Sequence, residues 1–320
     1  MELRDGMGRR ITYLRMSVTD RCNNRCVYCM PPEGVELTSH DKILTLEEFA
    51  ASAEKFARQF GIDKIRLTGG EPLLRRNIEW LVDKLANMPG VHDLAMTTNG
   101  AHLPDKAGTL YSAGLRRLNI SLDSLRHDRY YEITRGGNLD EVLVGIEIAK
   151  KIGFAPIKIN VVLLPGFDEE SEFVKWGNEN GYLIRFIEMM PGQHEITMNT
   201  GAPKMAEILS RLEPKFGEIK ILDEPSEEGK HVFQYRITGR DWIFEIIPSV
   251  SNHFCDVCNR LRLNCQGHLR FCLFSDEVLD IRSLLQASDE VFAQAIIHFA
   301  LRKKDSRKET LGSFMSSIGG

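Results

Sequence analysis

The sequence predicts an α/β protein, an incomplete (β/α)6 barrel followed by a smaller α+β domain. Short β-branched runs alternate with amphipathic stretches from Ile11 to about Met190, the pattern of repeated βα units. The repeat is about 30 residues long, as such units require. After about Pro191 this rhythm changes. Because 320 residues suffice for two domains of about 150 residues each, we expect residues 1–195 to form the partial barrel and residues 196–320 a second domain.

Six parallel strands and the helices between them make up the predicted barrel, which is of the TIM type. The expected strands are Ile11–Ser17, Lys64–Thr68, Leu94–Thr98, Arg117–Ser121, Ile157–Leu163 and Leu183–Glu188. Thr45 and Glu48 match a capping box, and the helix that they begin should run to Phe60 and end at Gly61. Two further helices, Asn77–Met88 and Asp140–Ile152, are each followed closely by a glycine.

The second domain is expected to combine hairpins with helices. We predict a loop at Leu222–Lys230, a hairpin from His231–Thr238 and Asp241–Pro248, a hairpin turn at Gln266-Gly267, and helices at Glu277–Gln286 and Asp289–Lys303.

Composition and charge exclude several classes of protein. Lys and Arg number 41 against 45 Asp and Glu, a net charge of −4, which argues against a nucleic-acid partner. No run approaches the roughly 18 apolar residues of a membrane helix, and Met1–Arg10 lacks the apolar core of a signal peptide. We therefore expect a soluble cytoplasmic protein.

Six of the seven cysteines fall into two groups of three. The first cysteine loop holds Cys22, Cys26 and Cys29, the second cysteine group holds Cys255, Cys258 and Cys272, and Cys265 is left over. An odd number of cysteines in a chain without a secretory signal argues against a disulfide framework.

Three thiolates on one loop are one ligand short of a closed zinc site. A four-iron cluster held by three cysteines instead keeps one iron open for a substrate or cofactor. The alternative is a zinc site that a distant histidine such as His253 completes.

Polar segments follow three of the expected strands: Thr68–Pro72, Thr97–Gly100 and Ser121–Ser124. In parallel sheets and barrels the ligand lies at the carboxyl ends of the strands. These segments should therefore share one mouth with the first cysteine loop.

The motifs resemble those of a known family. Cys-x3-Cys-x2-Cys with Tyr28 before the last cysteine, together with Gly69-Gly70-Glu71-Pro72, resembles the radical S-adenosylmethionine (SAM) superfamily. Within it, the chain is similar to the GTP 3′,8-cyclase family through Tyr13–Ser17, Asp20–Asn23, Ile65–Pro72, Thr97–Gly100, the second cysteine group and the terminal Gly319-Gly320. The resemblance implies two [4Fe-4S] clusters, one on each cysteine group, and an α+β iron–sulfur domain at the C-terminus.

The resemblance also implies ligand contacts. The residues expected at SAM are Tyr28, Gly69, Gly70, Glu71, Ser121 and Met190, with Met189 a near-equal candidate for the last. The second cluster would hold the purine of GTP. Cys265 could replace Cys272 as its ligand, although the family pattern favours Cys272.

A triphosphate requires fixed cations, and arginine makes paired bonds to phosphate oxygens. The candidates are Arg15, Lys64, Arg66, Lys158, Arg260 and Arg262. Arg15, Arg66 and Lys158 occupy alternating strand positions that would face a barrel lumen. By resemblance, Thr97 joins Arg66, Lys158, Arg260 and Arg262 at GTP, and Arg15 lies near the reacting ribose.

The implied reaction is that of a lyase. A 5′-deoxyadenosyl radical abstracts the hydrogen at C3′ of GTP, and C3′ attacks C8 to form 3′,8-cyclo-7,8-dihydro-GTP, the first step of molybdopterin biosynthesis. Proton delivery is expected near Arg15 or near Arg260 and Arg262, and Gly319 and Gly320 should enter the site as a flexible finger. The implied partners are an electron donor, a second copy in a homodimer and the downstream cyclic pyranopterin monophosphate synthase.

Three alternatives remain open from the sequence. The chain could be another radical SAM enzyme with an auxiliary-cluster domain that acts on a peptide. It could be a zinc-bearing binding module, for which Cys255-x2-Cys258 is the best evidence. The Gly-Gly end could serve as a sulfur carrier.

Overall fold

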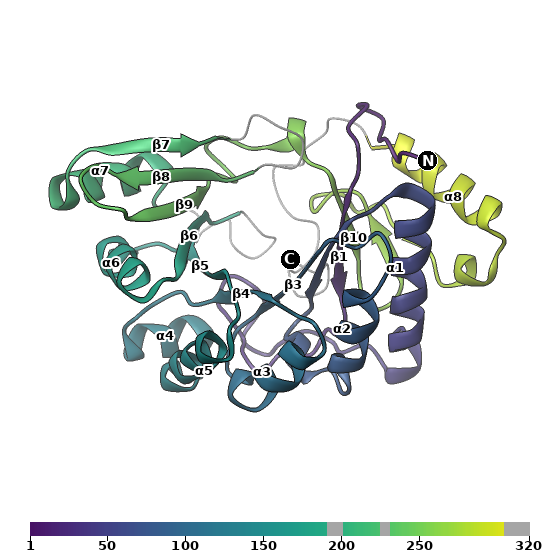
Figure 1. The fold of residues 1–320 in the computed structure, drawn as a ribbon, viewed down its shortest axis with the longest axis horizontal. Helices are drawn as coiled ribbons and strands as arrows, with labels where there is room; N and C mark the ends of the chain where they lie inside the picture. Colours follow the sequence, from purple (N-terminus) through teal and green to yellow (C-terminus); the bar gives the residue numbers. More distant parts are fainter. Residues whose placement is uncertain (191–200, 225–230, 304–320) are drawn as a thin grey trace.

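The computed structural model describes residues 1–190, 201–224 and 231–303. Six strands run parallel in chain order and curve around a central space (Figure 1). They are β1 Tyr13–Ser17, β2 Lys64–Thr68, β3 Asp93–Thr98, β4 Arg117–Ser121, β5 Ile157–Leu163 and β6 Leu183–Glu188. The predicted α/β class and partial barrel are confirmed, and only the first residues of β1 and β3 differ from the expected bounds.

Helices cover the outer face of these strands. They are α1 Leu46–Phe60, α2 Ile78–Ala86, α3 Leu103–Ser112, α4 His127–Thr134, α5 Leu139–Ile152 and α6 Glu170–Asn180. The capping box that begins α1 is present, with Thr45 accepting from the Glu48 N–H and Glu48 accepting from the Thr45 N–H. Gly61 at φ 65° and Gly153 at φ 110° end α1 and α5 in the left-handed conformation that glycine favours.

The C-terminal segments extend the sheet at both edges. They contain α7 Met205–Phe216, β7 Ile219–Asp223, β8 Phe233–Ile237, β9 Ile243–Ile247, β10 Arg260–Leu263, β11 His268–Arg270, β12 Leu279–Asp280 and α8 Asp289–Leu301. β9 pairs parallel with β6, and β10 pairs parallel with β1, so the sheet continues from β12 to β7 without interruption. Figure 1 shows α8 beside α1 and the N-terminus.

Both predicted hairpins are present in this region, as β8–β9 and β10–β11. The predicted helix at 277–286 is wrong in its first half, where Leu279 pairs with Leu269 as part of β12. A cross-strand pairing of this kind overrides local helix propensity. Strand β7 likewise begins before the predicted loop and includes Leu222. The predicted boundary at residue 195 lies outside the described residues, and the division there stays a prediction.

Alternation of side chains along the strands separates core from lumen. Leu14, Met16, Ile65, Leu67 and Ile159 are fully or almost fully buried and belong to the main hydrophobic core. The residues between them point to the opposite face of the sheet. In the part of the chain that the structure describes, no helix is long and apolar enough to cross a bilayer.

Candidate active site

A cavity of about 540 Å³ occupies the lumen. Strands β1–β10 contribute to its wall, and so do the first cysteine loop and residues next to the second cysteine group. The volume lies in the range of small-molecule sites. One cavity therefore connects the two cysteine-bearing regions.

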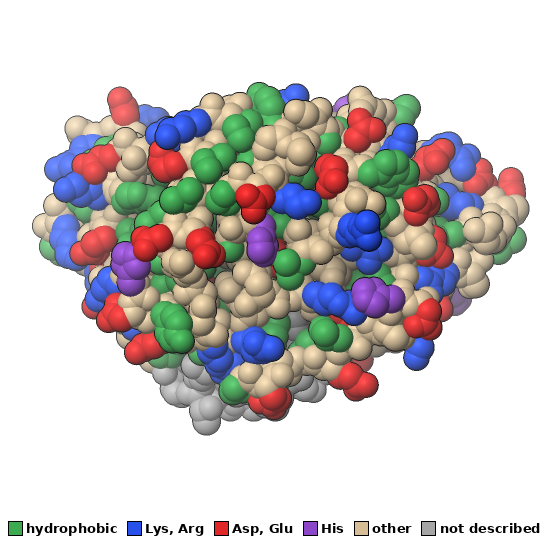
Figure 2. Space-filling model, turned by 90° about the horizontal axis from the view of Figure 1, so that it is seen from below, with side chains coloured by type: hydrophobic (Ala, Val, Ile, Leu, Met, Phe, Trp, Pro, Cys, Tyr) green, Lys and Arg blue, Asp and Glu red, His purple; other side chains and the backbone are tan. Residues whose placement is uncertain are grey.

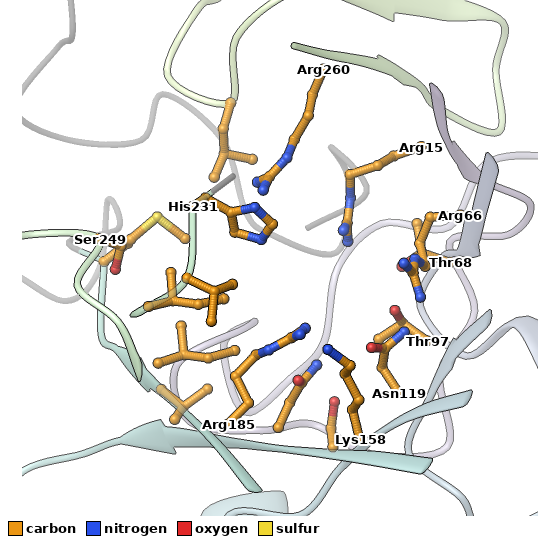
Figure 3. Close-up of a pocket in the computed structure, with 18 of the residues that line it drawn as sticks. Arg15, Arg66, Thr68, Thr97, Asn119, Lys158, Arg185, His231, Ser249 and Arg260 are labelled. Carbon is orange, nitrogen blue, oxygen red and sulfur yellow. The ribbon is translucent and has the colours of Figure 1, made fainter. Parts of the chain in front are cut away.

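One wall of the cavity is strongly basic. Strand register sets Tyr13 of β1 beside Lys64 and Arg260, and sets Arg15 beside Arg66 and Arg262. Paired residues lie on the same face of a sheet, so five cations from three neighbouring strands face one space. Figure 3 shows Arg15 and Arg260 extending into it.

The opposite wall carries two more cations around a shared carboxylate. Glu245 of β9 accepts from Lys158 Nζ at 3.0 Å and from Arg185 at 2.7 Å and 2.6 Å. All three side chains are largely buried. The figure shows Lys158 and Arg185 pointing toward Arg15 and Arg260 (Figure 3). Because one carboxylate balances two cations, this trio carries a net charge of one positive unit.

Tyr13 lies within the basic wall. Its hydroxyl accepts a 3.0 Å hydrogen bond from Arg66 Nε, and the guanidinium of Arg260 lies 5.7 Å from the ring centroid. Burial alone would raise the pKa of this phenol, but the charges of Arg66, Arg15 and Arg260 lower it to about 7. The lowered pKa of this phenol therefore indicates that positive charge is concentrated around it.

Arg262 and Arg15 show the same concentration of charge. Burial, together with repulsion between neighbouring guanidinium groups, lowers the pKa of Arg262 to about 9 and that of Arg15 to about 10. Both remain charged at neutral pH. A polyanion that enters the lumen would relieve this repulsion.

At the other end of the cavity, two glycines pack against the first cysteine loop. A Cβ on Gly70 would lie 2.3 Å from the carbonyl oxygen of Arg21, and one on Gly69 would lie 2.7 Å from that of Thr19. The Gly70 N–H donates to Thr19 at 2.7 Å. Only glycine permits this approach, which fixes the backbone directly before Cys22.

Glu71 joins the ends of two neighbouring strands without lining the cavity. Its carboxylate is fully buried and accepts from the Leu73 N–H, the Thr98 hydroxyl and the Asn99 N–H at 3.0, 2.7 and 2.7 Å. Burial raises its pKa to about 7, against the opposing effect of these three hydrogen bonds. Glu71 thus joins the loop after β2 to the loop after β3 and does not line the cavity.

The thiols of the first cysteine loop lie among buried polar groups. Burial raises the pKa of Cys22 to about 11, and burial with the charge of Asp123 raises that of Cys26 well above its ordinary value. Tyr28 donates its hydroxyl to Asp123 at 2.7 Å. The charges of Cys22 and Cys29 also act on Cys26, so the three thiols are close enough to interact.

The second cysteine group has cationic surroundings. Burial raises the pKa of the Cys258 thiol, but the charges of Lys303, Arg260 and Arg262 bring it below its ordinary value. The charges of Cys258 and Cys272 both raise the pKa of Arg262, so both thiols lie near this guanidinium. The guanidinium of Arg9 donates to the carbonyl of Cys255. Cations therefore surround this group.

Comparison with known proteins identifies the family. Residues 16–176 match the model of the radical SAM superfamily, and residues 182–310 match the family described as Molybdenum Cofactor Synthesis C. A protein of Geobacter sulfurreducens called GTP 3′,8-cyclase is 44% identical over 100% of both chains. One with the same name from Thermodesulfovibrio yellowstonii is 41% identical over 99% of this chain and 100% of its own. The chain belongs to the GTP 3′,8-cyclase family of radical SAM proteins.

A solved structure shares the fold of this family member. SuiB of Streptococcus suis bound to S-adenosylmethionine superposes with a TM-score of 0.62 at 15% identity, over 90% of this chain and 66% of that one. At this identity the likeness concerns the fold alone.

The family implies an iron–sulfur cluster on the first cysteine loop. Within residues 1–190, 201–224 and 231–303, no three His, Cys, Asp or Glu side chains converge as the ligands of a single metal ion do. A four-iron cluster binds each thiolate to a different iron, so its ligands stand farther apart than those of zinc. Three interacting thiols at the edge of the cavity, on a loop fixed by Gly69 and Gly70, fit such a cluster.

The structure gathers most of the predicted site residues around one cavity. Those that line it are Arg15, Cys22, Cys26, Tyr28, Cys29, Lys64, Arg66, Gly69, Gly70, Thr97, Ser121, Lys158, Met190, Arg260 and Arg262. Cys255, Cys258 and Cys272 do not line it, although Asn259 and Leu273, their neighbours in the chain, do. Gly319 and Gly320 lie outside the described residues. Buried Cys265 belongs to the hydrophobic core and does not line the cavity.

The two methionine candidates line the cavity but pack in different places. Met189 joins a cluster that includes Val27 and Tyr28 of the first cysteine loop. Met190 packs against Leu273 and Phe274 beside Cys272. The choice between them as a SAM contact therefore stays a prediction.

Sequence reasoning missed Tyr13, Arg117, Arg185 and Glu245 as lining residues. Arg185 carried a usable signal, since it lies between Ile184 and Phe186 as Lys158 lies between Ile157 and Ile159. A cation between apolar strand residues favoured the lumen in both cases. Glu245 lies between Phe244 and Ile246 in the same way. Its contact with Lys158 and Arg185 carried no signal, because it depends on the pairing of β9 with β6.

Proposed function

We propose that this chain converts GTP into 3′,8-cyclo-7,8-dihydro-GTP, the first step of molybdopterin biosynthesis. The observation that carries the proposal is full-length similarity to proteins named GTP 3′,8-cyclase, joined to a basic cavity between two cysteine groups. A bound [4Fe-4S] cluster with SAM supplies the 5′-deoxyadenosyl radical that abstracts the hydrogen at C3′ of GTP.

The first cysteine loop is proposed to hold the SAM-binding cluster, with Tyr28, Gly70, Ser121 and Met190 or Met189 at SAM. The Gly70 N–H already donates to Thr19, so its carbonyl oxygen is the group that it offers to the SAM amino group. The Tyr28 hydroxyl is bonded to Asp123, which leaves the ring and backbone of Tyr28 for SAM. Gly69 acts by positioning, through its close packing on Thr19 before this loop. Glu71 does so through its N–H, which donates to the Arg21 carbonyl at 2.8 Å, and through its carboxylate, which holds the loop after β3.

The basic walls are proposed to bind the triphosphate. Arg15, Arg66, Arg260 and Arg262 present guanidinium groups that make paired bonds to phosphate oxygens, and Lys64 and Lys158 add point charges. Arg185 joins this set, because it shares Glu245 with Lys158. Thr97 supplies a hydroxyl from β3. Binding on several strands at once would hold the ribose in one orientation, and that positioning is the protein's main contribution to rate.

A second [4Fe-4S] cluster on Cys255, Cys258 and Cys272 is proposed to hold the purine. Lowering of the Cys258 pKa by surrounding cations favours the thiolate that such a cluster requires. Proton delivery is assigned to Arg15 or to Arg260 and Arg262. A one-electron donor, a homodimer and a downstream cyclic pyranopterin monophosphate synthase complete the proposal.

The decisive experiment uses anaerobically reconstituted protein with SAM and dithionite, with and without GTP. We expect 5′-deoxyadenosine to accumulate in step with loss of GTP. Cleavage of SAM that is indifferent to GTP would favour the peptide-acting alternative. A colourless protein that carries zinc and no iron would favour the binding module.

An arginine variant tests the triphosphate assignment. Charge-assisted bonds contribute about 1.5–3 kcal/mol, so Arg260→Ala should raise the KM for GTP about 10- to 100-fold while leaving the protein able to cleave SAM. Lys220→Ala is the control, since Lys220 is 61% exposed and pairs with Glu218 outside the cavity. An unchanged KM in Arg260→Ala would contradict the assignment.

A further inference from the structure

Lys303 is a buried cation behind the second cysteine group. Its side chain is 8% exposed, and its Nζ makes no hydrogen bond within the described residues. An ion pair with Asp5 Oδ2 at 3.6 Å is longer than a hydrogen bond. Because burying an ammonium without hydrogen bonds is costly, its position calls for a further anionic partner.

The carboxylate of Asp5 already accepts hydrogen bonds from other groups. Its Oδ1 accepts from the Met7 and Arg9 N–H groups at 3.0 and 3.1 Å, and its Oδ2 accepts from Arg9 at 2.8 Å. The Asp5 side chain is fully buried, and Arg9 balances its charge. Asp5, Arg9 and Lys303 together therefore carry a net charge of one positive unit.

This trio contacts the second cysteine group through Arg9. Arg9 donates to the Cys255 carbonyl, and the N-terminal arm around Gly6 packs so closely that a Cβ there would lie 2.6 Å from the Lys303 carbonyl oxygen. The Gly6 N–H also donates to Ala300 at the end of α8. Through Asp5 and Arg9, Lys303 is therefore linked to the backbone of Cys255 in the second cysteine group.

Lys303 differs from those two arginines in its access to the lumen. Arg260 and Arg262 line the cavity, where phosphate groups can neutralise them, whereas Lys303 does not line it. We propose that Lys303 is a permanent counter-charge for the iron–sulfur cluster on Cys255, Cys258 and Cys272, and that it raises the reduction potential of that cluster. The inference rests on the proposed function, which supplies the second cluster.

Electrostatics explains the direction. Reduction adds one negative charge to a cluster that three thiolates already make anionic, and net charge and burial set its potential. A fixed positive charge in a low-dielectric interior stabilises the reduced form more than the oxidised form. Lys303 would do so whether or not the cavity contains a ligand.

The test isolates the second cluster in the full-length chain. Serine replaces Cys22, Cys26 and Cys29, and the remaining cluster is titrated by electron paramagnetic resonance at controlled potential. In this background Lys303→Met should lower the midpoint by about 59 mV, the equivalent of a tenfold change in the one-electron equilibrium. Lys303→Arg should keep the parent value, and Arg302→Met, which removes a 54%-exposed cation next to it, should shift nothing.

The outcomes separate this inference from the proposed function. Full iron content with an unchanged midpoint in Lys303→Met would overturn the inference and leave the second cluster in place. Loss of iron in Lys303→Met that Lys303→Arg restores would support a requirement for charge, whereas equal loss in both would indicate packing and overturn it. If the variant with serine at positions 22, 26 and 29 binds no iron, the chain has no second cluster, and the proposed function is contradicted as well.

Discussion

The two cysteine groups share a ligand set but lie in opposite electrostatic surroundings. At the first cysteine loop, burial and the nearby carboxyl of Glu71 or Asp123 raise the thiol pKa values. At the second group, Lys303, Arg260 and Arg262 outweigh burial and lower the pKa of Cys258. The cavity thus has one end built of glycines and buried carboxyl groups and another built of cations.

This difference shows how one fold can assign separate tasks to similar ligands. A cluster among carboxylates is harder to reduce than one among cations, because negative charge nearby opposes the added electron. Cations at the second end also attract the phosphates of a nucleotide. The two ends are therefore suited to a strong reductant and to an anionic substrate, respectively.

Gly70→Ala should disrupt the first cysteine loop and leave the second cysteine group intact. The added Cβ would lie 2.3 Å from the Arg21 carbonyl oxygen, so the backbone before Cys22 must shift. We expect a loss of more than about 100-fold in 5′-deoxyadenosine formation, since an ångström-scale displacement at a site is worth that much. The assay is anaerobic SAM cleavage with iron quantified in the same sample, and roughly half of the iron should remain.

Gly108→Ala is the matched control for that substitution. Gly108 lies within α3 and a Cβ there would meet nothing within 4 Å. Alanine in a helix interior should stabilise the protein by about 0.5–1 kcal/mol without changing activity. Full SAM cleavage in Gly70→Ala would show that the loop tolerates the shift and that the glycines are not needed for its geometry.

Local features of the barrel could be predicted from the sequence nearly residue by residue. The capping box at Thr45 and the left-handed Gly153 depend on interactions within one or two helical turns. The strand bounds followed from short β-branched runs. The alternation of side chains along those strands placed Arg15, Arg66 and Lys158 on the lumen side. These features could be predicted because the interactions that cause them join residues that are close together in the sequence.

Long-range pairings could not be predicted in this way. Glu245 reaches Lys158 across 87 residues, and Arg9 reaches Cys255 across 246. Each contact depends on which segments of the chain become neighbours in the folded protein. The secondary-structure propensity of a residue contains no information about those neighbours. The expected helix at 277–286 failed for the same reason, since Leu279 is held by Leu269 in β12.

Glu245→Gln tests whether Glu245 balances the charges of Lys158 and Arg185 until a triphosphate binds. The substitution leaves Lys158 and Arg185 buried without their shared carboxylate, a loss of about 3 kcal/mol by analogy with broken buried ion pairs. A bound triphosphate would replace the missing charge. Thermal unfolding under anaerobic conditions should therefore show a larger GTP-induced rise in Tm for this variant than for the parent protein.

Glu169→Gln controls for the loss of any buried carboxylate. Glu169 accepts from the Ser124 hydroxyl and the Leu125 N–H at 2.7 Å each and does not line the cavity. Its variant should be destabilised too, but GTP should raise its Tm no more than in the parent protein. Equal GTP responses in all three proteins would contradict a role for Glu245 in balancing the substrate-binding cations.

The smallest expected effect concerns Tyr13. With a pKa of about 7, this phenol is neutral at pH 6 and largely a phenolate at pH 8, where its negative charge opposes a triphosphate beside Arg66 and Arg15. The γ-phosphate of GTP loses its last proton with a pKa of about 6, and this added negative charge strengthens the attraction of GTP to the arginines over the same pH range.

The measurement is the KM for GTP of the parent protein divided by the KM of Tyr13→Phe at each pH. This ratio cancels the titration of GTP itself, because both proteins bind the same substrate. We expect this ratio to rise about three- to tenfold from pH 6 to pH 8, because one pKa unit of coupling corresponds to a tenfold change in affinity. Parallel KM profiles would mean that the three arginines do not hold the phenol in an ionisable state, and the cationic end would then be less concentrated in charge than its geometry indicates.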